Sequence, residues 1–188
     1  RVLILICWSI VLLCATQAMA AIYVAQPEDH HNPVPKLRPG DILRFGAGFY
    51  IRGLKIHDLH GTSAQPIVIE GPANGEPAVL LGQPRRNVVS INDSSFVVVR
   101  NLEIDGRGAF VDGVKTERNA GSAHHITLEN LYIHNLVRHQ QSVGISTKCP
   151  AWDWVVRGNR IVGVGTGMYF GDSDGSDPFI GGLIEDNE

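Results

Sequence analysis

The segment Phe96–Ile104 reads FVVVRNLEI, and the later segment His125–Ile133 reads HITLENLYI. A third copy at 154–162 reads WVVRGNRIV, and a shorter fourth copy at 182–187 reads GLIEDN. The copies align on an asparagine that recurs almost evenly along the chain, at Asn101, Asn130, Asn159 and Asn187. A regular period within the range of roughly 20 to 50 residues is the sequence signature of a solenoid, in which each repeat packs on the next.

Each copy is a short alternating run rich in β-branched residues, and the segments between copies are rich in Gly, Asp, Asn and Ser. These patterns predict strands joined by turns rather than helices. A second family of short strands is predicted between the copies, at residues 88–91, 113–116, 144–147 and 167–170. Strands that recur once per coil pair in parallel with their counterparts about 4.8 Å away. We therefore predict an all-β fold, a right-handed parallel β-helix.

The repeated asparagine has a physical role in such a coil. Asn tolerates the left-handed conformation of sharp turns, and stacked amides hydrogen-bond from coil to coil. The four asparagines are therefore predicted to form a single column, with Arg100 beside Glu129 on neighbouring strands. The third copy departs from the pattern, because Arg157 falls where Val99 and Leu128 point inward. That strand is expected either to slip by one residue or to carry a bulge.

Residues 1–20 are predicted to be a signal peptide. A positive charge precedes an almost unbroken apolar run from Val2 to Ala15, and small residues stand at Ala18 and Ala20, the positions that signal peptidase reads. The alternative is a membrane anchor, for which the run is short. Cleavage after Ala20 predicts a secreted or periplasmic protein that does not contact the membrane.

The mature chain is predicted to be one domain. Residues 21–36 are assigned to an N-terminal extension and cap, and residues 37–188 to β-helix coils, as the N-terminal portion of a longer helix whose last coil is cut off. The net charge of −3 and the lack of a basic block exclude a nucleic-acid partner. Cys149 is the one cysteine left after cleavage, which excludes an intramolecular disulfide. The oligomeric state stays open.

Three motifs precede the asparagine copies, in the order Leu37-Arg-Pro-Gly-Asp41, Gly48-Phe-Tyr50 and Gly61-Thr-Ser-Ala-Gln-Pro-Ile-Val-Ile-Glu-Gly71. Together with the copies, they resemble the first coils of secreted right-handed β-helix proteins of the pectin-lyase-like superfamily. The resemblance covers most of the chain from Leu37 onwards. It implies a carbohydrate-active protein, because enzymes of this kind act on acidic polysaccharides as lyases, hydrolases or C5 epimerases. Their active side chains project outward from one parallel sheet.

Alternation along the second strand family divides its side chains between two faces. Val114, Thr116, Ile145, Thr147, Met168 and Phe170 are predicted to point inward, and Lys115, Glu117, Ser146, Lys148 and Tyr169 outward. Elimination from a uronate needs a base for the C5 proton and a cation that neutralises the carboxylate. Either Lys148 or Tyr169 suits the base, and Lys115 or a bound Ca²⁺ suits the cation. We predict Lys148 as the base, with Lys115, Tyr169 and Asp172 supporting it and with Glu117 and Ser146 contacting substrate.

The stretch 145–148 resembles the segment that contains the base in calcium-dependent lyases acting on alginate and dermatan. In that family acidic metal ligands lie just upstream of the lysine, where this chain has Gln141 and Val143. This difference favours a second hypothesis, a non-catalytic β-helix module that binds a glycan or forms part of the cell envelope. In that case Lys115 and Lys148 are ordinary solvated lysines.

Two further candidates lie outside these strands. Asp172, Asp174 and Asp177 surround a glycine at close spacing, which suits Ca²⁺; the alternatives are a polar turn, or carboxylates that act as acid and base. Trp152 and Trp154 flank Asp153, and we predict that one packs inward while the other, Trp152, stacks on a sugar ring. Packing on the strand is the alternative for Trp152 as well.

Overall fold

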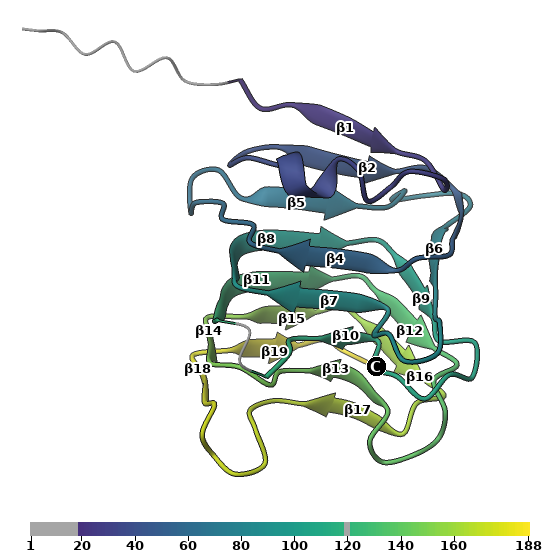
Figure 1. The fold of residues 1–188 in the computed structure, drawn as a ribbon, viewed down its shortest axis with the longest axis vertical. Helices are drawn as coiled ribbons and strands as arrows, with labels where there is room; N and C mark the ends of the chain where they lie inside the picture. The colour runs from purple at the N-terminus through teal and green to yellow at the C-terminus, as the bar shows by residue number, and fades with distance from the viewer. Residues whose placement is uncertain (1–18, 119–120) are drawn as a thin grey trace, which may run out of the picture.

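The computed structural model describes residues 19–118 and 121–188, which form a stack of about five turns with the N-terminal end at the top of Figure 1. Three parallel sheets run along the stack, and each turn of the chain adds to all three in the same order. The predicted all-β parallel β-helix is confirmed. Residues 1–18, most of the predicted signal peptide, lie outside the described residues.

The strands are distributed over the sheets as follows. Sheet A contains β1 (Ile22–Ala25), β2 (Ile42–Phe45), β5 (Ile67–Glu70), β8 (Ser94–Arg100), β11 (Ala123–Glu129), β14 (Ala151–Trp152) and β18 (Phe179–Ile180), with β15 (Val155–Arg157) and β19 (Leu183–Glu185) continuing from the second half of β11. Sheet B contains β3 (Gly48–Tyr50), β6 (Ala78–Leu81), β9 (Glu103–Asp105), β12 (Tyr132–His134) and β16 (Arg160–Val162). Sheet C contains β4 (Leu54–His57), β7 (Val89–Asn92), β10 (Val114–Lys115), β13 (Val143–Ser146) and β17 (Thr166–Tyr169).

The segment assigned to an extension and cap packs on the first coil. β1 pairs in parallel with β2 and so adds a strand to sheet A. The 3-10 turn η1 (Val34–Lys36) buries Val34 beside Leu37. His30 is also buried, and its Nε2 lies 2.8 Å from the carbonyl oxygen of Gly53. These contacts close the apolar interior at this end of the stack.

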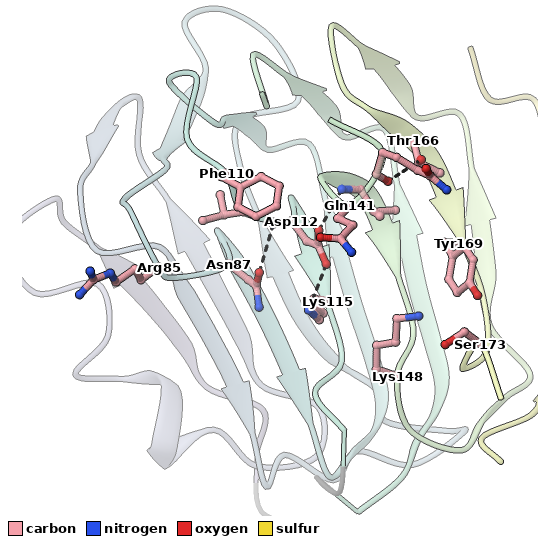
Figure 2. Close-up of a pocket in the computed structure, with 13 residues that line it drawn as sticks. Arg85, Asn87, Phe110, Asp112, Lys115, Gln141, Lys148, Thr166, Tyr169 and Ser173 are labelled. Atoms are coloured by element: carbon pink, nitrogen blue, oxygen red, sulfur yellow. Dashed lines mark hydrogen bonds and ion pairs between the residues drawn. The ribbon is translucent and has the colours of Figure 1, made fainter. Parts of the chain in front are cut away.

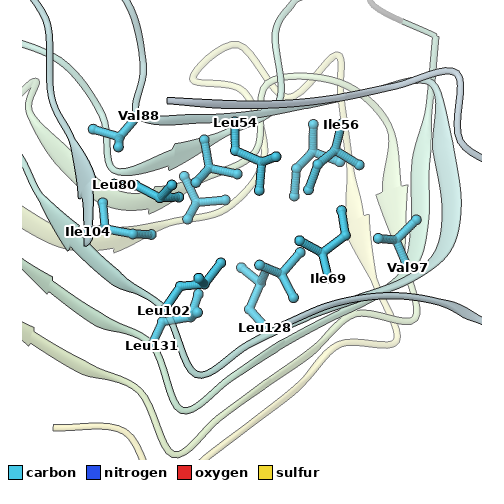
Figure 3. Packing of buried hydrophobic residues seen from close by; sticks show 14 of the residues in the cluster. Leu54, Ile56, Ile69, Leu80, Val88, Val97, Leu102, Ile104, Leu128 and Leu131 are labelled. Atoms are coloured by element: carbon cyan, nitrogen blue, oxygen red, sulfur yellow. The ribbon is translucent and has the colours of Figure 1, made fainter. Parts of the chain in front are cut away.

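The core is a continuous column of mainly aliphatic side chains enclosed by the three sheets (Figure 3), with Phe45, Tyr50 and Trp154 as its large aromatic members. Burying each Val, Leu or Ile side chain stabilises the fold by about 1.5–3 kcal/mol. On sheet C the predicted inward residues Val114, Thr116, Ile145 and Thr147 are buried, and Met168 and Phe170 pack half-buried against the core. The predicted inward set is therefore confirmed. Of the predicted outward residues on the strands, Tyr169 is exposed and Lys115 is half-buried, whereas Ser146 is buried.

The predicted single column of asparagines is wrong in one respect. Glu129 pairs with Arg100 and with Arg157, so Asn130 lies level with Asn101 on one side and with Gly158 on the other. The third copy has thus slipped by one residue, which leaves Val156 inward at the level of Leu128. Asn159 and Asn187 form a second column beside the first, one residue further along the same corner.

The slip has a physical reason, because each column satisfies a different need. Asn101 and Asn130 adopt φ values of 55° and 52°, and the side-chain amide of Asn130 lies 3.5 Å from that of Asn101. Asn159 is instead buried, where its Oδ1 accepts the backbone N–H of Leu131 at 2.9 Å and its Nδ2 donates to the carbonyl of Leu128 at 3.0 Å. An inward asparagine at the corner therefore pairs backbone groups of the coil above.

The predicted proximity of Arg100 and Glu129 is confirmed, within a longer column of alternating charge on sheet A. The column runs Arg44, Glu70, Arg100, Glu129, Arg157 and Glu185. Glu70 accepts hydrogen bonds from Nε of Arg44 at 2.9 Å and from Nη2 of Arg100 at 2.7 Å. Arg157 pairs with Glu129 at 3.3 Å. Opposite charges on adjacent strands favour this register over a slipped one.

Candidate functional site

A cavity of about 570 Å³ opens on the outer face of sheet C (Figure 2). Lys115 on β10 is level with Ser146 on β13 and with Tyr169 on β17, and Lys148 follows two residues after Ser146. The structure therefore brings three predicted residues to one cavity: Lys115, Lys148 and Tyr169. Val143 and Thr166, the first residues of β13 and β17, also line the cavity. Loops between the strands complete the lining with Arg85, Asn87, Phe110, Val111, Asp112, Gln140, Gln141 and Ser173.

A column of glycines lets the coils approach closely beside this cavity. A Cβ atom on Gly113 would lie 2.6 Å from the carbonyl oxygen of Gly144, and one on Gly144 would lie 2.5 Å from the carbonyl oxygen of Gly167. Any side chain there would collide with backbone of the next coil, so the close approach requires glycine. Because Gly113 directly follows Asp112, the same corner places the Asp112 carboxylate against the coil that carries β13.

Asp112 is the main site residue that the sequence did not reveal. Its side chain is 6% exposed; Oδ1 accepts the backbone N–H of Val143 at 2.9 Å and Oδ2 accepts the hydroxyl of Ser146 at 3.0 Å. Nζ of Lys115 lies 3.3 Å from Oδ2. Ser146, predicted to contact substrate, is completely buried, so in this structure its hydroxyl supports the carboxylate that holds Lys115. The proximity of Asp112 and Ser146 depends on the pairing of β10 with β13, which composition does not show.

Lys148 is held by three contacts. Its Nζ lies 3.8 Å from the centre of the Tyr169 ring, 3.4 Å from the carbonyl oxygen of Gly171 and 3.8 Å from Oδ1 of Asp172. A ring face, a carbonyl oxygen and a carboxylate are the partners of an ammonium cation. Figure 2 shows the Lys148 amine beside the Tyr169 ring at one end of the cavity.

The loop that follows β17 does not fit the predicted calcium site. Asp172 and Asp174 both face the guanidinium of Arg118, which contacts Asp172 directly and lies 3.7 Å from Asp174. The backbone N–H of Ser173 and the guanidinium hold the pKa of Asp172 below its ordinary value. In residues 19–118 and 121–188, no group of three His, Cys, Asp or Glu side chains is placed to hold a metal ion. The positive charge of Arg118 at this position would repel a bound cation. Asp177 stabilises the loop through its backbone, because its carbonyl oxygen accepts the N–H of Asp172 at 3.1 Å.

The two remaining predicted residues, Glu117 and Trp152, do not line the cavity. Glu117 is half-buried and accepts a hydrogen bond from Nδ2 of Asn87 at 2.5 Å, so it supports a cavity residue from outside the lining. Trp152 lies on sheet A, where its ring stacks on His124 at 4.3 Å. That contact covers one face of the indole, and the residue belongs to a different side of the molecule from the cavity. Trp154 is the tryptophan that packs inward, and its Nε1 donates to Ala123 at 2.8 Å.

Comparison with solved structures identifies proteins of the same architecture. The alginate lyase from Paenibacillus sp. str. FPU-7 superposes with a TM-score of 0.68 at 19% identity, over 88% of this chain and 58% of the lyase. The GH136 lacto-N-biosidase from Eubacterium ramulus gives a TM-score of 0.65 at 18% identity, over 89% of this chain and 41% of the enzyme. The chain shares their fold. It spans about half of the length of these two enzymes. No protein-family model and no curated protein matches the sequence.

Within the part of the chain that the structure describes, no helix is long and apolar enough to cross a membrane.

Proposed function

We propose that the protein acts on an acidic polysaccharide by elimination at a uronate residue, or by the related C5 epimerisation, and that it does so in a secreted or periplasmic location. The observation that supports the proposal is the convergence of Lys115, Lys148 and Tyr169 on one cavity of the exposed sheet C face. The predicted signal peptide agrees with the location. Two proteins of the same fold are carbohydrate-degrading enzymes by name, one of them an alginate lyase.

The chemistry assigns one step to each side chain. Lys115 lies where it can neutralise the substrate carboxylate, which makes the C5 proton acidic enough to remove. Lys148 accepts that proton as general base, and the hydroxyl of Tyr169 donates a proton to the O4 leaving group as the C4–O4 bond breaks. The products are a new reducing end and a sugar with a double bond between C4 and C5. Return of a proton to the opposite face of C5, without bond cleavage, would give the epimer.

The surroundings of Lys148 set a condition on this mechanism. Its contacts with Tyr169, Gly171 and Asp172 are those of an ammonium group, so the lysine must lose its proton before it acts as a base. The value of kcat/KM is therefore expected to rise with pH on the acid limb of the profile, because a general base acts in its deprotonated form. Asp112 does not take part in proton transfer in this proposal, because its two oxygens are bound to the backbone of Val143, to Ser146 and to Lys115.

The proposal is tested by incubating the full chain with alginate, pectate and glycosaminoglycans and recording the ultraviolet absorbance of unsaturated uronate. NMR of the products detects epimerisation. Lys148→Ala is expected to lower kcat by about 10²–10⁴-fold, as is usual for loss of a general base, with Tyr169→Phe also strongly impaired. Arg52→Ala, at an exposed site outside the cavity lining, serves as the control. Lack of both products on every substrate, or an active Lys148→Ala variant, would refute the mechanism.

A binding-only role is the second candidate, and one observation favours it. Each cavity lysine already has a carboxylate partner, Asp112 at 3.3 Å from Lys115 and Asp172 at 3.8 Å from Lys148. Lysines held in this way still attract an anionic chain, and a binding role needs no proton transfer from them. Glycan-array binding that persists in a Lys115→Ala and Lys148→Ala double variant would place the binding surface elsewhere. Binding that the double variant abolishes, in a protein that releases no product, would establish a glycan-binding cavity.

A further inference from the structure

The two cavity lysines differ in how their carboxylate partners are held. Asp112 is bound to the backbone and a side chain of the strand β13, so the partner of Lys115 is anchored in a sheet. Asp172 lies in the loop 171–178, outside any strand, although its side chain is only 3% exposed. The position of Lys148 therefore depends on what keeps this loop in place.

Among residues 19–118 and 121–188, few polar contacts join that loop to the rest of the molecule. Within the loop, Gly175 N–H donates to the carbonyl of Asp172 at 3.1 Å, and the Ser176 hydroxyl donates to Asp174 at 2.6 Å. These bonds shape the loop without attaching it. At its first residue the N–H of Gly171 donates to Oγ1 of Thr147 at 2.8 Å, and at its last residue the carbonyl of Pro178 accepts the N–H of Ala151 at 3.0 Å, so the loop is attached at both ends.

Between these two ends, Arg118 attaches the loop across a long distance in sequence. It follows β10, and the loop follows β17, so the two are separated by 54 residues. Since β10 pairs with β13 and β13 with β17, Arg118 reaches across the coil that carries Lys148. Its Nη2 contacts Oδ2 of Asp172, while Oδ1 of the same carboxylate faces Nζ of Lys148 at 3.8 Å. One carboxylate thus joins the arginine to the lysine.

We propose that Arg118 is a positioning residue of this site, which holds the loop 171–178 through Asp172 and thereby fixes the Lys148 amine and the Ser173 wall of the cavity. Ser173 lines the cavity and follows Asp172 directly, so a loop released from Arg118 moves both features together. The activity consequence of this inference rests on the proposed function, whereas the restraint on Lys148 does not.

The restraint is measured by acetylating the full chain under limiting reagent and following each lysine by mass spectrometry. In Arg118→Ala, Lys148 is expected to react about two- to tenfold faster than in the parent. This factor corresponds to the loss of one ion pair that is exposed or partly buried. Lys115 is the internal control, since Asp112 holds it independently of the loop. Asp172→Asn removes both the Arg118 contact and the Lys148 contact, so it is expected to raise the Lys148 rate at least as much. Adding Arg118→Ala to Asp172→Asn is expected to change little further, because the contact of Arg118 is already lost. Arg52→Ala is expected to leave both rates unchanged.

Two outcomes would overturn the inference. One is an unchanged Lys148 rate in both Arg118→Ala and Asp172→Asn; the other is an equal rise at Lys115 and Lys148, which would indicate general loosening. If the protein cleaves a uronan, Arg118→Ala is further expected to lower kcat/KM about two- to tenfold and to alter its pH profile, which a purely structural role would not do. If the parent protein is inactive on every substrate, the proposed function fails, while the acetylation rates still decide the role of Arg118.

Discussion

Replacing Asn159 by alanine tests the corner that distinguishes this β-helix from a simple repeat. The side chain is 1% exposed and makes three hydrogen bonds, to the N–H of Leu131 at 2.9 Å, to the carbonyl of Leu128 at 3.0 Å and to Oδ1 of Asn187 at 2.9 Å. In Asn159→Ala the buried N–H of Leu131 loses this partner. An unpaired buried donor costs about 1–3 kcal/mol, and each lost hydrogen bond about 1 kcal/mol. The expected loss in the free energy of unfolding is therefore about 2–4 kcal/mol.

The measurement is urea denaturation followed by circular dichroism, with the stability change taken from the midpoint at unchanged slope. Asn130→Gly is the matched control at the same corner. Asn130 has a φ of 52°, a weak 3.5 Å amide contact and an exposed side chain, and glycine occupies its level in the next coil, at Gly158. The control is expected to cost less than about 1 kcal/mol, since glycine adopts this conformation freely. Equal losses in the two variants would refute the reasoning that the inward asparagine pairs buried backbone groups.

Three further predictions concern other parts of the stack. Gly144→Ala places a Cβ 2.5 Å from the carbonyl oxygen of Gly167. In urea denaturation it is expected to lower the free energy of unfolding by about 1–3 kcal/mol. Gly167→Ala, with open space around its Cβ, is the control and is expected to change the stability little. Burial and neighbouring histidines lower the pKa of His124 from 6.5. The stability that neutral His124 contributes is therefore present above about pH 6.5 and is lost as the pH falls below it. The melting temperatures of the parent and of His124→Gln should converge as the pH falls from 7 to about 5. Burial raises the pKa of Glu70, but hydrogen bonds from two arginines outweigh it and lower the pKa from 4.5 overall. Glu70→Gln is expected to lower the free energy of unfolding by about 1–2 kcal/mol at pH 7 and low salt. In thermal melts at acid pH, the difference in melting temperature between parent and variant should vanish as Glu70 becomes protonated.

The fold was predictable because sheet A repeats almost regularly. Arg100, Glu129 and Arg157 are level with one another on this sheet and follow at nearly equal intervals along the chain, so a single sequence shows the period directly. The slip in the third copy was less predictable. The alignment of Arg157 with the inward residues Val99 and Leu128 indicated that something changes there, but a slip and a bulge give the same local sequence pattern. The structure decides between them, because the buried amide of Asn159 bonds the backbone of the coil above.

The outward residues of the site were also predictable, although their partners were not. Alternation alone places Lys115 and Tyr169 on one face of sheet C, and this part of the prediction needs no knowledge of the loops. The partners depend on which residues of different coils are level. Asp112 and Arg118 flank the short strand β10 and have no counterpart in the repeated pattern, and each acts on a side chain at least one coil away. The histidine that stacks on Trp152 is likewise set by the pairing of β11 with β14.

The irregular spacing of sheet C explains why the site forms there. Ser90, Lys115, Ser146 and Tyr169 are level on this sheet, and the interval along the chain is longest between Lys115 and Ser146 and clearly shorter on either side. Since the strands of sheet A recur almost evenly, the variation lies in the loops that border sheet C, and loops of unequal length leave a hollow beside the strands. The same loops supply Phe110, Gln140 and Ser173 to the cavity wall. The regular part of the repeat thus carries the stability of the stack, and the irregular part supplies the concave, charged surface on which the proposed chemistry depends.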